Sequence, residues 1–381
     1  MDQEKALLFR EICRRRAPTR RLLARRLSLR PSSVSAAIQE LLDDGLVTER
    51  AVARQRSGRP DLLIAPRPNR LVAISLYVDS RELKAVLLNL DEEVLHEEAR
   101  VVSPKAGNVE LAGAIVDLLQ ALPRHVPRGS RLSGASLSLV GTVNARTRTW
   151  VNAARWPKLS NLDLRAVDQA VPYPVLLRRT NDAELEYQLE SLPEARDRNA
   201  LLLHWGFGIG SAVALQGELL TSRLGRSGEI GHARLDPGRD RPCLCGSRGC
   251  LETVAALWAL QPALRKRLGS LPRDERDLAP RLGDPGVLAV PELQEAFSAV
   301  RDALLVLYKV FYPDIVFLSG PFTENPVVFQ RLSQEFHRAL PAYARTAVTV
   351  RLVPAGMPGC RLGGANPVFR RALGSALRRR P

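Results

Sequence analysis

The ten residues "CLCGSRGCLE" (243–252) hold three of the chain's five cysteines. A histidine, His232, stands a short way upstream in "GEIGHARL" (228–235). Together His232, Cys243, Cys245 and Cys250 have the spacing H-x10-C-x-C-x4-C. Thiolate sulfur and imidazole nitrogen are ligands that Zn²⁺ prefers, and four of them fill its tetrahedral coordination. The pattern therefore predicts a closed, structural Zn²⁺ site. The alternative, stray thiols beside a surface histidine, does not explain why the cysteines gather here.

Four further stretches accompany this loop in a fixed order along the chain. They are "GASLSLVGTVN" (134–144), "TNDAE" (180–184), "GFGIG" (206–210) and "PDIVFLSG" (313–320). Together with the cysteine loop, these motifs resemble the ROK family, which contains sugar kinases and sugar-responsive transcriptional repressors. The resemblance implies an α/β fold with a two-lobed, actin-like (hexokinase/ROK-type) ATPase-fold domain. Lobe 1 is expected at 71–180 and lobe 2 at 181–381, with the C-terminal helix returning to lobe 1.

The resemblance also implies a sugar site. The family's sugar-binding positions fall here on Asn181, Asp182, Glu229, His232 and Glu252. Carboxylates suit this task because they accept hydrogen bonds from vicinal hydroxyls, and His232 could bind zinc through one ring nitrogen while facing the sugar with the other. Glu184 departs from the family pattern, because it replaces the second Asn of N-D-A-N. Taken alone, Asp182 would be an ordinary acidic residue at a helix N-terminus.

The first seventy residues predict a different unit. Three helical patterns and two short strands follow one another, an order typical of a winged helix-turn-helix, expected at 1–66. This region holds 16 Lys and Arg against 8 Asp and Glu, half of the chain's net charge of +16. The alternative is a helical protein-interaction domain with a solvated basic face. The basic charge and the element order favour binding of double-stranded operator DNA.

Particular side chains are expected to contact that DNA. The third helix presents small polar groups to the major groove, and arginines near it and in the wing tip "RQRSGRP" (54–60) can meet phosphates or a groove. The candidates are Arg20, Arg30, Ser32, Ser33, Ser35, Gln39, Arg56 and Arg59.

Composition bounds the remaining possibilities. Of the 381 residues, 45% are hydrophobic, which favours a globular chain. No apolar run approaches the roughly 20 residues of a membrane helix, and the N-terminus lacks the apolar core of a signal peptide. Cys13 and Cys360 are isolated, so a disulfide framework has little support. We therefore expect a cytoplasmic protein without a membrane partner.

One stretch, "VAISLYVDSRELK" (72–84), bears on whether the chain is an enzyme. The family's kinases carry D-x-G-G-T here, where the Asp organises Mg²⁺ and the glycines admit phosphate. In this chain Ser75 stands at the Asp position, while Tyr77 and Val78 stand at glycine positions. We expect the Tyr77 ring to block phosphate. The prediction is therefore a non-enzymatic regulator; in a kinase, Asp182 would be the general base.

The resulting hypothesis is a repressor that binds DNA as a homodimer or higher oligomer, as the family's repressors do. A sugar or sugar derivative, bound between the lobes, would favour a closed state that lowers operator affinity. Two alternatives stay open: a ROK-type kinase that phosphorylates a hexose, and a constitutive DNA-binding protein with a vestigial sugar pocket.

Overall fold

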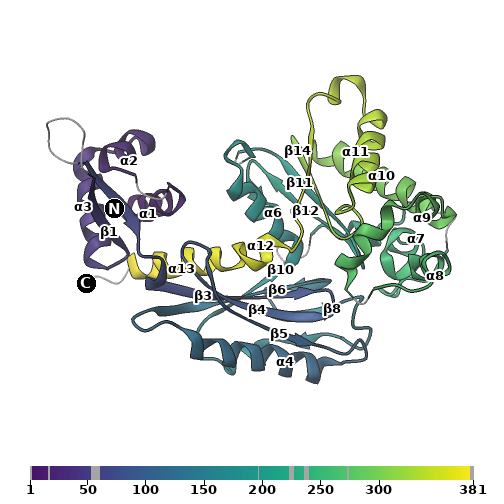
Figure 1. The fold of residues 1–381 in the computed structure, drawn as a ribbon, viewed down its shortest axis with the longest axis horizontal. Helices are drawn as coiled ribbons and strands as arrows, with labels where there is room; N and C mark the ends of the chain where they lie inside the picture. Colours follow the sequence, from purple (N-terminus) through teal and green to yellow (C-terminus); the bar gives the residue numbers. More distant parts are fainter. Residues whose placement is uncertain are drawn as a thin grey trace.

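The computed structural model describes residues 2–15, 18–52, 61–195, 197–222, 227–235, 240–272 and 274–377. A small helical unit at the N-terminus is followed by two sheets, each flanked by helices (Figure 1). Within these ranges, no helix combines the length and the apolarity that a bilayer crossing requires.

The N-terminal unit has the element order expected from the sequence. Its elements are α1 (Asp2–Arg15), α2 (Arg20–Leu27), α3 (Pro31–Asp43), β1 (Val47–Val52) and β2 (Asp61–Pro66). Thr19 caps α2, since its hydroxyl accepts a hydrogen bond from the N–H of Leu22 at 3.2 Å. The apolar faces of the three helices meet, with Leu8, Val34 and Ile38 fully buried. Strands β1 and β2 pair antiparallel, as a wing does. Its tip, with Arg56 and Arg59, lies outside the described residues.

The first sheet has the strand order β10-β6-β3-β4-β5. Its strands are β3 (Leu71–Asp79), β4 (Glu82–Asn89), β5 (Val94–Val101), β6 (Arg131–Leu139) and β10 (Val175–Arg179). Every residue of β3 is buried, because both faces of the sheet are covered. Helix α4 (Asn108–Ala121) and η2 (Leu122–His125) cover one face. On the other lie α12 (Pro358–Arg361), η7 (Gly363–Ala365) and α13 (Asn366–Leu377) (Figure 1).

The second sheet has the order β13-β12-β11-β14-β15. Its strands are β11 (Ala200–Trp205), β12 (Ile209–Leu215), β13 (Glu218–Leu219), β14 (Ile315–Ser319) and β15 (Thr349–Leu352). One face packs against α6 (Thr180–Ser191). The other packs against a larger helical layer: η4 (Ile230–His232), α7 (Glu252–Ala255), α8 (Leu257–Leu268), η5 (Glu275–Gly283), α9 (Pro285–Leu288), α10 (Pro291–Phe311), α11 (Pro326–Ala339) and η6 (Ala342–Ala344).

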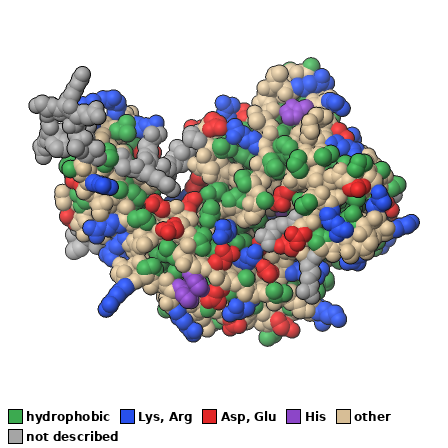
Figure 2. Space-filling model, in the orientation of Figure 1, with side chains coloured by type: hydrophobic (Ala, Val, Ile, Leu, Met, Phe, Trp, Pro, Cys, Tyr) green, Lys and Arg blue, Asp and Glu red, His purple; other side chains and the backbone are tan. Residues whose placement is uncertain are grey.

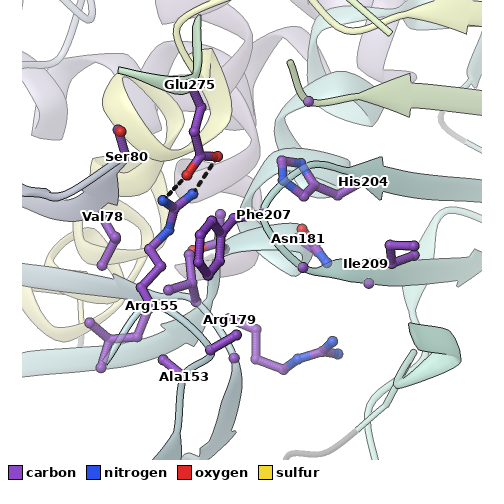
Figure 3. A pocket seen from close by; sticks show the side chains of 18 of the residues that line it. Val78, Ser80, Ala153, Arg155, Arg179, Asn181, His204, Phe207, Ile209 and Glu275 are labelled. Atoms are coloured by element: carbon purple, nitrogen blue, oxygen red, sulfur yellow. Dashed lines mark hydrogen bonds and ion pairs between the residues drawn. The ribbon is translucent and has the colours of Figure 1, made fainter. Parts of the chain in front are cut away.

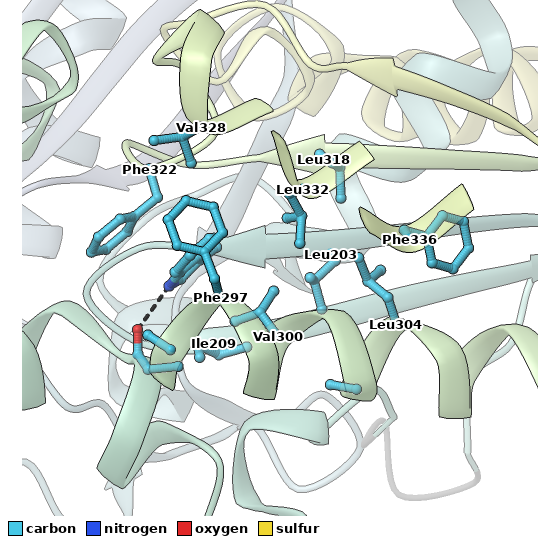
Figure 4. Packing of buried hydrophobic residues seen from close by; sticks show 14 of the residues in the cluster. Leu203, Ile209, Phe297, Val300, Leu304, Leu318, Phe322, Val328, Leu332 and Phe336 are labelled. Carbon is cyan, nitrogen blue, oxygen red and sulfur yellow. Dashed lines mark hydrogen bonds between the residues drawn. The ribbon is translucent and has the colours of Figure 1, made fainter. Parts of the chain in front are cut away.

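Aromatic packing fixes that helical layer to the sheet. Trp205 stacks on Phe322 and meets Phe297 edge to face, and its indole N–H donates to the carbonyl of Ala255 at 2.7 Å (Figure 4). Burying both the ring and its polar N–H in this way anchors the end of α7 beside the sheet.

Two parts of the architecture were not expected. No motif indicates a strand after "PDIVFLSG", but β15 follows β14 and pairs parallel with it. A three-stranded sheet of β7 (Thr142–Asn144), β8 (Thr149–Asn152) and β9 (Leu162–Asp163) was also missed. Both consist of short strands, which carry a weak periodic signal. The remaining short elements are η1 (Pro68–Arg70), α5 (Arg165–Gln169) and η3 (Pro193–Ala195). The domain boundaries given above stay predictions.

Candidate functional site

A cavity of about 470 Å³ opens between the two sheets. One wall comes from the β3–β4 hairpin and the segment after β8, and the other comes from the β11–β12 turn, α6 and the cysteine loop. Figure 3 shows Val78, Ser80 and Arg155 on one side and Asn181, His204 and Ile209 on the other. Small-molecule sites commonly have volumes of roughly 300–1,000 Å³. The cavity therefore has room for a ligand the size of a monosaccharide.

Four of the five predicted sugar-binding residues line this cavity: Asn181, Glu229, His232 and Glu252. Glu252 is held rigidly, because one carboxylate oxygen accepts from the N–H of Ile209 at 2.7 Å and the other from the indole of Trp258 at 3.3 Å. The loop presses closely on this carboxylate. A Cβ at Gly231 would collide with the carbonyl of Ile209 and with Glu252, so only glycine fits there.

Asp182, the fifth residue, does not line the cavity. It is buried, and its carboxylate accepts from Nη1 of Arg179 at 3.3 Å. Burial raises the pKa of Asp182, although Arg179 opposes the rise. Arg179 itself lines the cavity, donates to Ser227 Oγ at 2.9 Å, and lies 3.8 Å from Glu229. This central arginine was not predicted, because its only signal in the sequence is its place just before "TND".

Glu184 stands at the cavity wall with an unusual environment. Its carboxylate accepts from the N–H of Gly359 at 2.9 Å and from the amide of Gln188 at 3.0 Å. Burial outweighs these hydrogen bonds and raises the pKa of Glu184 to about 7. The folded protein therefore holds this proton at a pH where the unfolded chain has released it.

This shift gives a pH prediction for Glu184→Gln. Between about pH 4.5 and 7 the unfolded chain binds fewer protons at this site than the folded protein does. The unfolding free energy of the wild type therefore falls as the pH rises through this range. We expect the variant to gain about 3 kcal/mol of unfolding free energy relative to wild type at pH 8, and nothing at pH 4.5. Urea unfolding of both proteins across this range measures it. A difference that does not vary with pH would contradict the assignment.

The four predicted metal ligands lie together. Their ligand atoms all fall within 4.8 Å of one another. Nδ1 of His232 lies 3.7 Å from Sγ of Cys243, and Sγ of Cys245 lies 3.8 Å from Sγ of Cys250. Tetrahedral zinc with Zn–S of about 2.3 Å places two sulfur ligands roughly 3.8 Å apart. The arrangement could therefore bind a metal ion, and its spacing fits zinc.

The environment of the three thiols disfavours a negative charge on two of them, and a bound cation would offset this cost. Burial raises the pKa of Cys243 and of Cys250. Burial opposes the Cys245 thiolate as well, but hydrogen bonds, the first from the Ser247 N–H, lower the pKa of Cys245. A bound divalent cation deprotonates such thiols and balances their charge.

The hairpin that bears on enzymatic activity differs from expectation in one respect. The Tyr77 ring does not block the cavity; it is buried on the opposite side, in the apolar cluster that contains Cys360 and Phe369. Alternation along β3 explains this, because it turns Val78 to the cavity instead. Ser75 is fully buried, and its hydroxyl donates to the carbonyl of Cys360 at 2.6 Å.

A cross-cavity contact was also missed by the sequence analysis. Arg155, in the segment after β8, forms a two-pronged ion pair with Glu275, with Nη2 to Oε2 at 2.8 Å (Figure 3). Both side chains are 12% exposed, and the guanidinium lies 5.0 Å from the ring centre of Phe207. Burial, and then Arg155, lower the pKa of the nearby His204 to about 4. Because Glu275 belongs to the helical layer of the second sheet, the pair joins the two walls.

The predicted DNA-contacting residues differ in their availability. Arg30, Ser32 and Gln39 are exposed along α3, although the Gln39 amide donates to Asp43 at 3.0 Å. Ser33 and Ser35 on the same helix are half-buried. Arg20 instead pairs with Glu49, with Nε to Oε1 at 2.8 Å, and braces α2 against the wing. Figure 2 shows Lys and Arg side chains over this unit.

Comparison with known proteins finds a family model and a relative that each cover most of the chain. The ROK family model matches residues 74–361. The DNA-binding transcriptional repressor Mlc of Escherichia coli is 24% identical over 342 residues, which are 85% of this chain and 82% of that protein.

Two solved structures share the fold. The crystal structure of a ROK family transcriptional regulator, a homologue of E. coli Mlc, has a TM-score of 0.76 at 20% identity, covering 99% of this chain and 98% of that one. The ROK hexokinase from Thermus thermophilus has a TM-score of 0.61 at 25% identity, covering 79% and 98%. The predicted actin-like fold with an N-terminal DNA-binding region is thereby confirmed.

Proposed function

This chain belongs to the ROK family, and on that basis we propose that it is a DNA-binding transcriptional repressor whose cavity takes a sugar or sugar derivative as effector. One observation carries the proposal: a basic three-helix unit with a wing precedes a cavity lined by Asn181, Glu229, His232 and Glu252. The regulator structure spans 99% of the chain, whereas the hexokinase spans 79%. A protein that binds operator DNA would act in the cytoplasm. As a homodimer or higher oligomer it would match an operator with two half-sites.

A structural zinc ion fits this proposal. His232, Cys243, Cys245 and Cys250 would hold it, and it would supply a fixed centre for a loop that carries few apolar residues. Glu252 follows two residues after Cys250, and His232 lines the cavity. Metal binding would thus determine where both groups meet the effector.

A physical route connects the cavity to the DNA-binding unit. Asn181 stands in the first turn of α6, and Arg370 of α13 pairs with two carboxylates on α6, Glu186 at 2.6 Å and Glu190. Helix α13 in turn contacts α1, and their side chains share one apolar cluster. A shift of α6 on effector binding would reach the winged helix through this packed chain. Coupling of this kind is typically about 1–3 kcal/mol.

The kinase alternative is less well supported by the hairpin at the phosphate end. Ser75 offers no carboxylate to Mg²⁺, and its hydroxyl is already bonded to Cys360. The side chains of Val78 and Ser80 line the cavity where a kinase needs close approach of bare backbone. A constitutive DNA-binding protein with a vestigial pocket stays the other alternative, since Arg179 already engages Asp182.

A mobility-shift experiment tests the proposal. The probe is promoter DNA beside the protein's own gene, with a panel of free and phosphorylated sugars, and parallel tubes measure ATP consumption. We expect one sugar to release the DNA without ATP turnover. Sugar-dependent ATP turnover with no DNA shift would instead support the kinase, and a shift insensitive to every sugar would support the vestigial pocket.

The pair that joins the cavity walls gives a further prediction. Glu275→Arg places two like charges across the cavity, so the closed arrangement should become less favourable. We expect about a tenfold higher effector concentration for half-maximal DNA release, from roughly 1.4 kcal/mol of lost closure. The double variant Arg155→Glu, Glu275→Arg should recover most of the loss. If the double variant behaves as badly as the single one, the pair does not act as a latch.

A further inference from the structure

Two of the chain's five histidines lie on the first lobe, far from the cysteine loop in sequence. His96 belongs to β5 and His125 ends η2, and their rings stack at 3.5 Å with an interplanar angle of 10°. Glu98 lies beside them, with Oε1 at 3.6 Å from Nε2 of His96 and 3.9 Å from Nε2 of His125. Figure 2 shows histidine side chains gathered at the surface of this lobe.

Strand register brings the three groups to one face. His96 lies opposite Leu87 and Glu98 opposite Ala85, and both partners belong to the core beneath α4. Side chains opposite each other in an antiparallel pair point the same way, so His96 and Glu98 face the side that η2 covers. His125 then approaches from above. The cluster is therefore built on a strand and on a segment packed against it, rather than on a free loop.

We propose that His96, Glu98 and His125 form a second metal site, for a divalent transition cation such as Zn²⁺. The three ligand atoms lie within 4.8 Å of one another. Two ligands of tetrahedral zinc stand roughly 3.3 Å apart, and to bind one cation both imidazoles would turn out of their stacked arrangement so that their nitrogen lone pairs converge. Imidazole nitrogen with carboxylate oxygen suits Zn²⁺, Ni²⁺ or Cu²⁺.

The surroundings limit the affinity of this site. Its side chains are 31%, 21% and 42% exposed for His96, Glu98 and His125, so a cation keeps water on its open side. Arg100 competes weakly, since its Nη2 lies 3.4 Å from the second oxygen of Glu98. Three protein ligands and an open position describe an exchangeable site, in contrast to the closed set of four in the cysteine loop.

Isothermal titration of Zn²⁺ into full-length protein that already carries its cysteine-loop metal tests the proposal. We expect a second, weaker equivalent per chain that disappears in His125→Ala and His96→Ala. His337→Ala, which removes a histidine from α11, is the matched control and should keep it. Circular dichroism and the urea midpoint establish that each variant is folded.

Cysteine and histidine variants separate the two sites. Cys250→Ser should lose the first equivalent and keep the second, so that failure of one site is distinguishable from failure of the other. A second equivalent that survives in both histidine variants overturns the proposal. So does a wild-type protein that binds no second equivalent with zinc in large excess.

Discussion

Cys250→Ser is expected to lose zinc and to unfold the loop that carries His232 and Glu252. Cys250 is 1% exposed, and its sulfur lies 3.8 Å from Cys245. Removing one thiolate leaves three ligands and a buried hydroxyl that cannot replace it. Because structural zinc contributes on the order of 10 kcal/mol to small metal-held units, we expect at least about 5 kcal/mol of lost stability in this lobe. Metal content by elemental analysis and thermal unfolding measure the two effects.

Cys13→Ser is the matched control for this substitution. Cys13 lies in α1, is half-buried, and is far from the loop in sequence. The control should keep its zinc and its response to effector. If Cys250→Ser retained zinc and full stability, the cysteine cluster would have no metal-binding role.

The residues that could be predicted best from the sequence are those whose chemistry is concentrated in a short motif. The four residues of the candidate metal site could be named from their spacing alone, and the structure brings their ligand atoms within 4.8 Å of one another. Asn181, Glu229, His232 and Glu252 came from the family resemblance, and they line one cavity. The N-terminal unit could be predicted because its three helices carry clear apolar faces, and Thr19 caps α2.

What the sequence did not disclose depends on contacts between distant residues. Arg155 and Glu275 are 120 positions apart, and nothing in either local pattern predicts that they meet. Arg179 looked like one more arginine in an arginine-rich chain, but burial places it between Asp182 and Glu229. Tyr77 was assigned to the wrong face, because a motif position was considered without the alternation of the strand that carries it.

Asn181→Ala should separate effector sensing from DNA binding. The side chain lines the cavity from the first turn of α6, and the N-terminal unit lies beyond α13 (Figure 1). Loss of its amide leaves a sugar hydroxyl without a partner, which costs about 2 kcal/mol, or roughly 30-fold in affinity. We therefore expect about 30-fold more sugar for half-maximal release of operator DNA, with DNA affinity in the absence of sugar unchanged.

Arg30→Ala provides the reciprocal experiment. Arg30 is exposed at the start of α3, so its loss should weaken operator binding by about 1–3 kcal/mol and leave sugar affinity intact. Mobility shifts measure the operator affinity, and calorimetry with the sugar that releases the DNA measures the sugar affinity. The two variants are expected to fail in opposite assays, because the cavity and the winged helix are separate parts of the chain, and one packed route between them runs through α6 and α13. If Asn181→Ala weakened operator binding as much as Arg30→Ala does, the cavity would belong to the DNA-binding machinery, and the division between sensor and reader would be wrong.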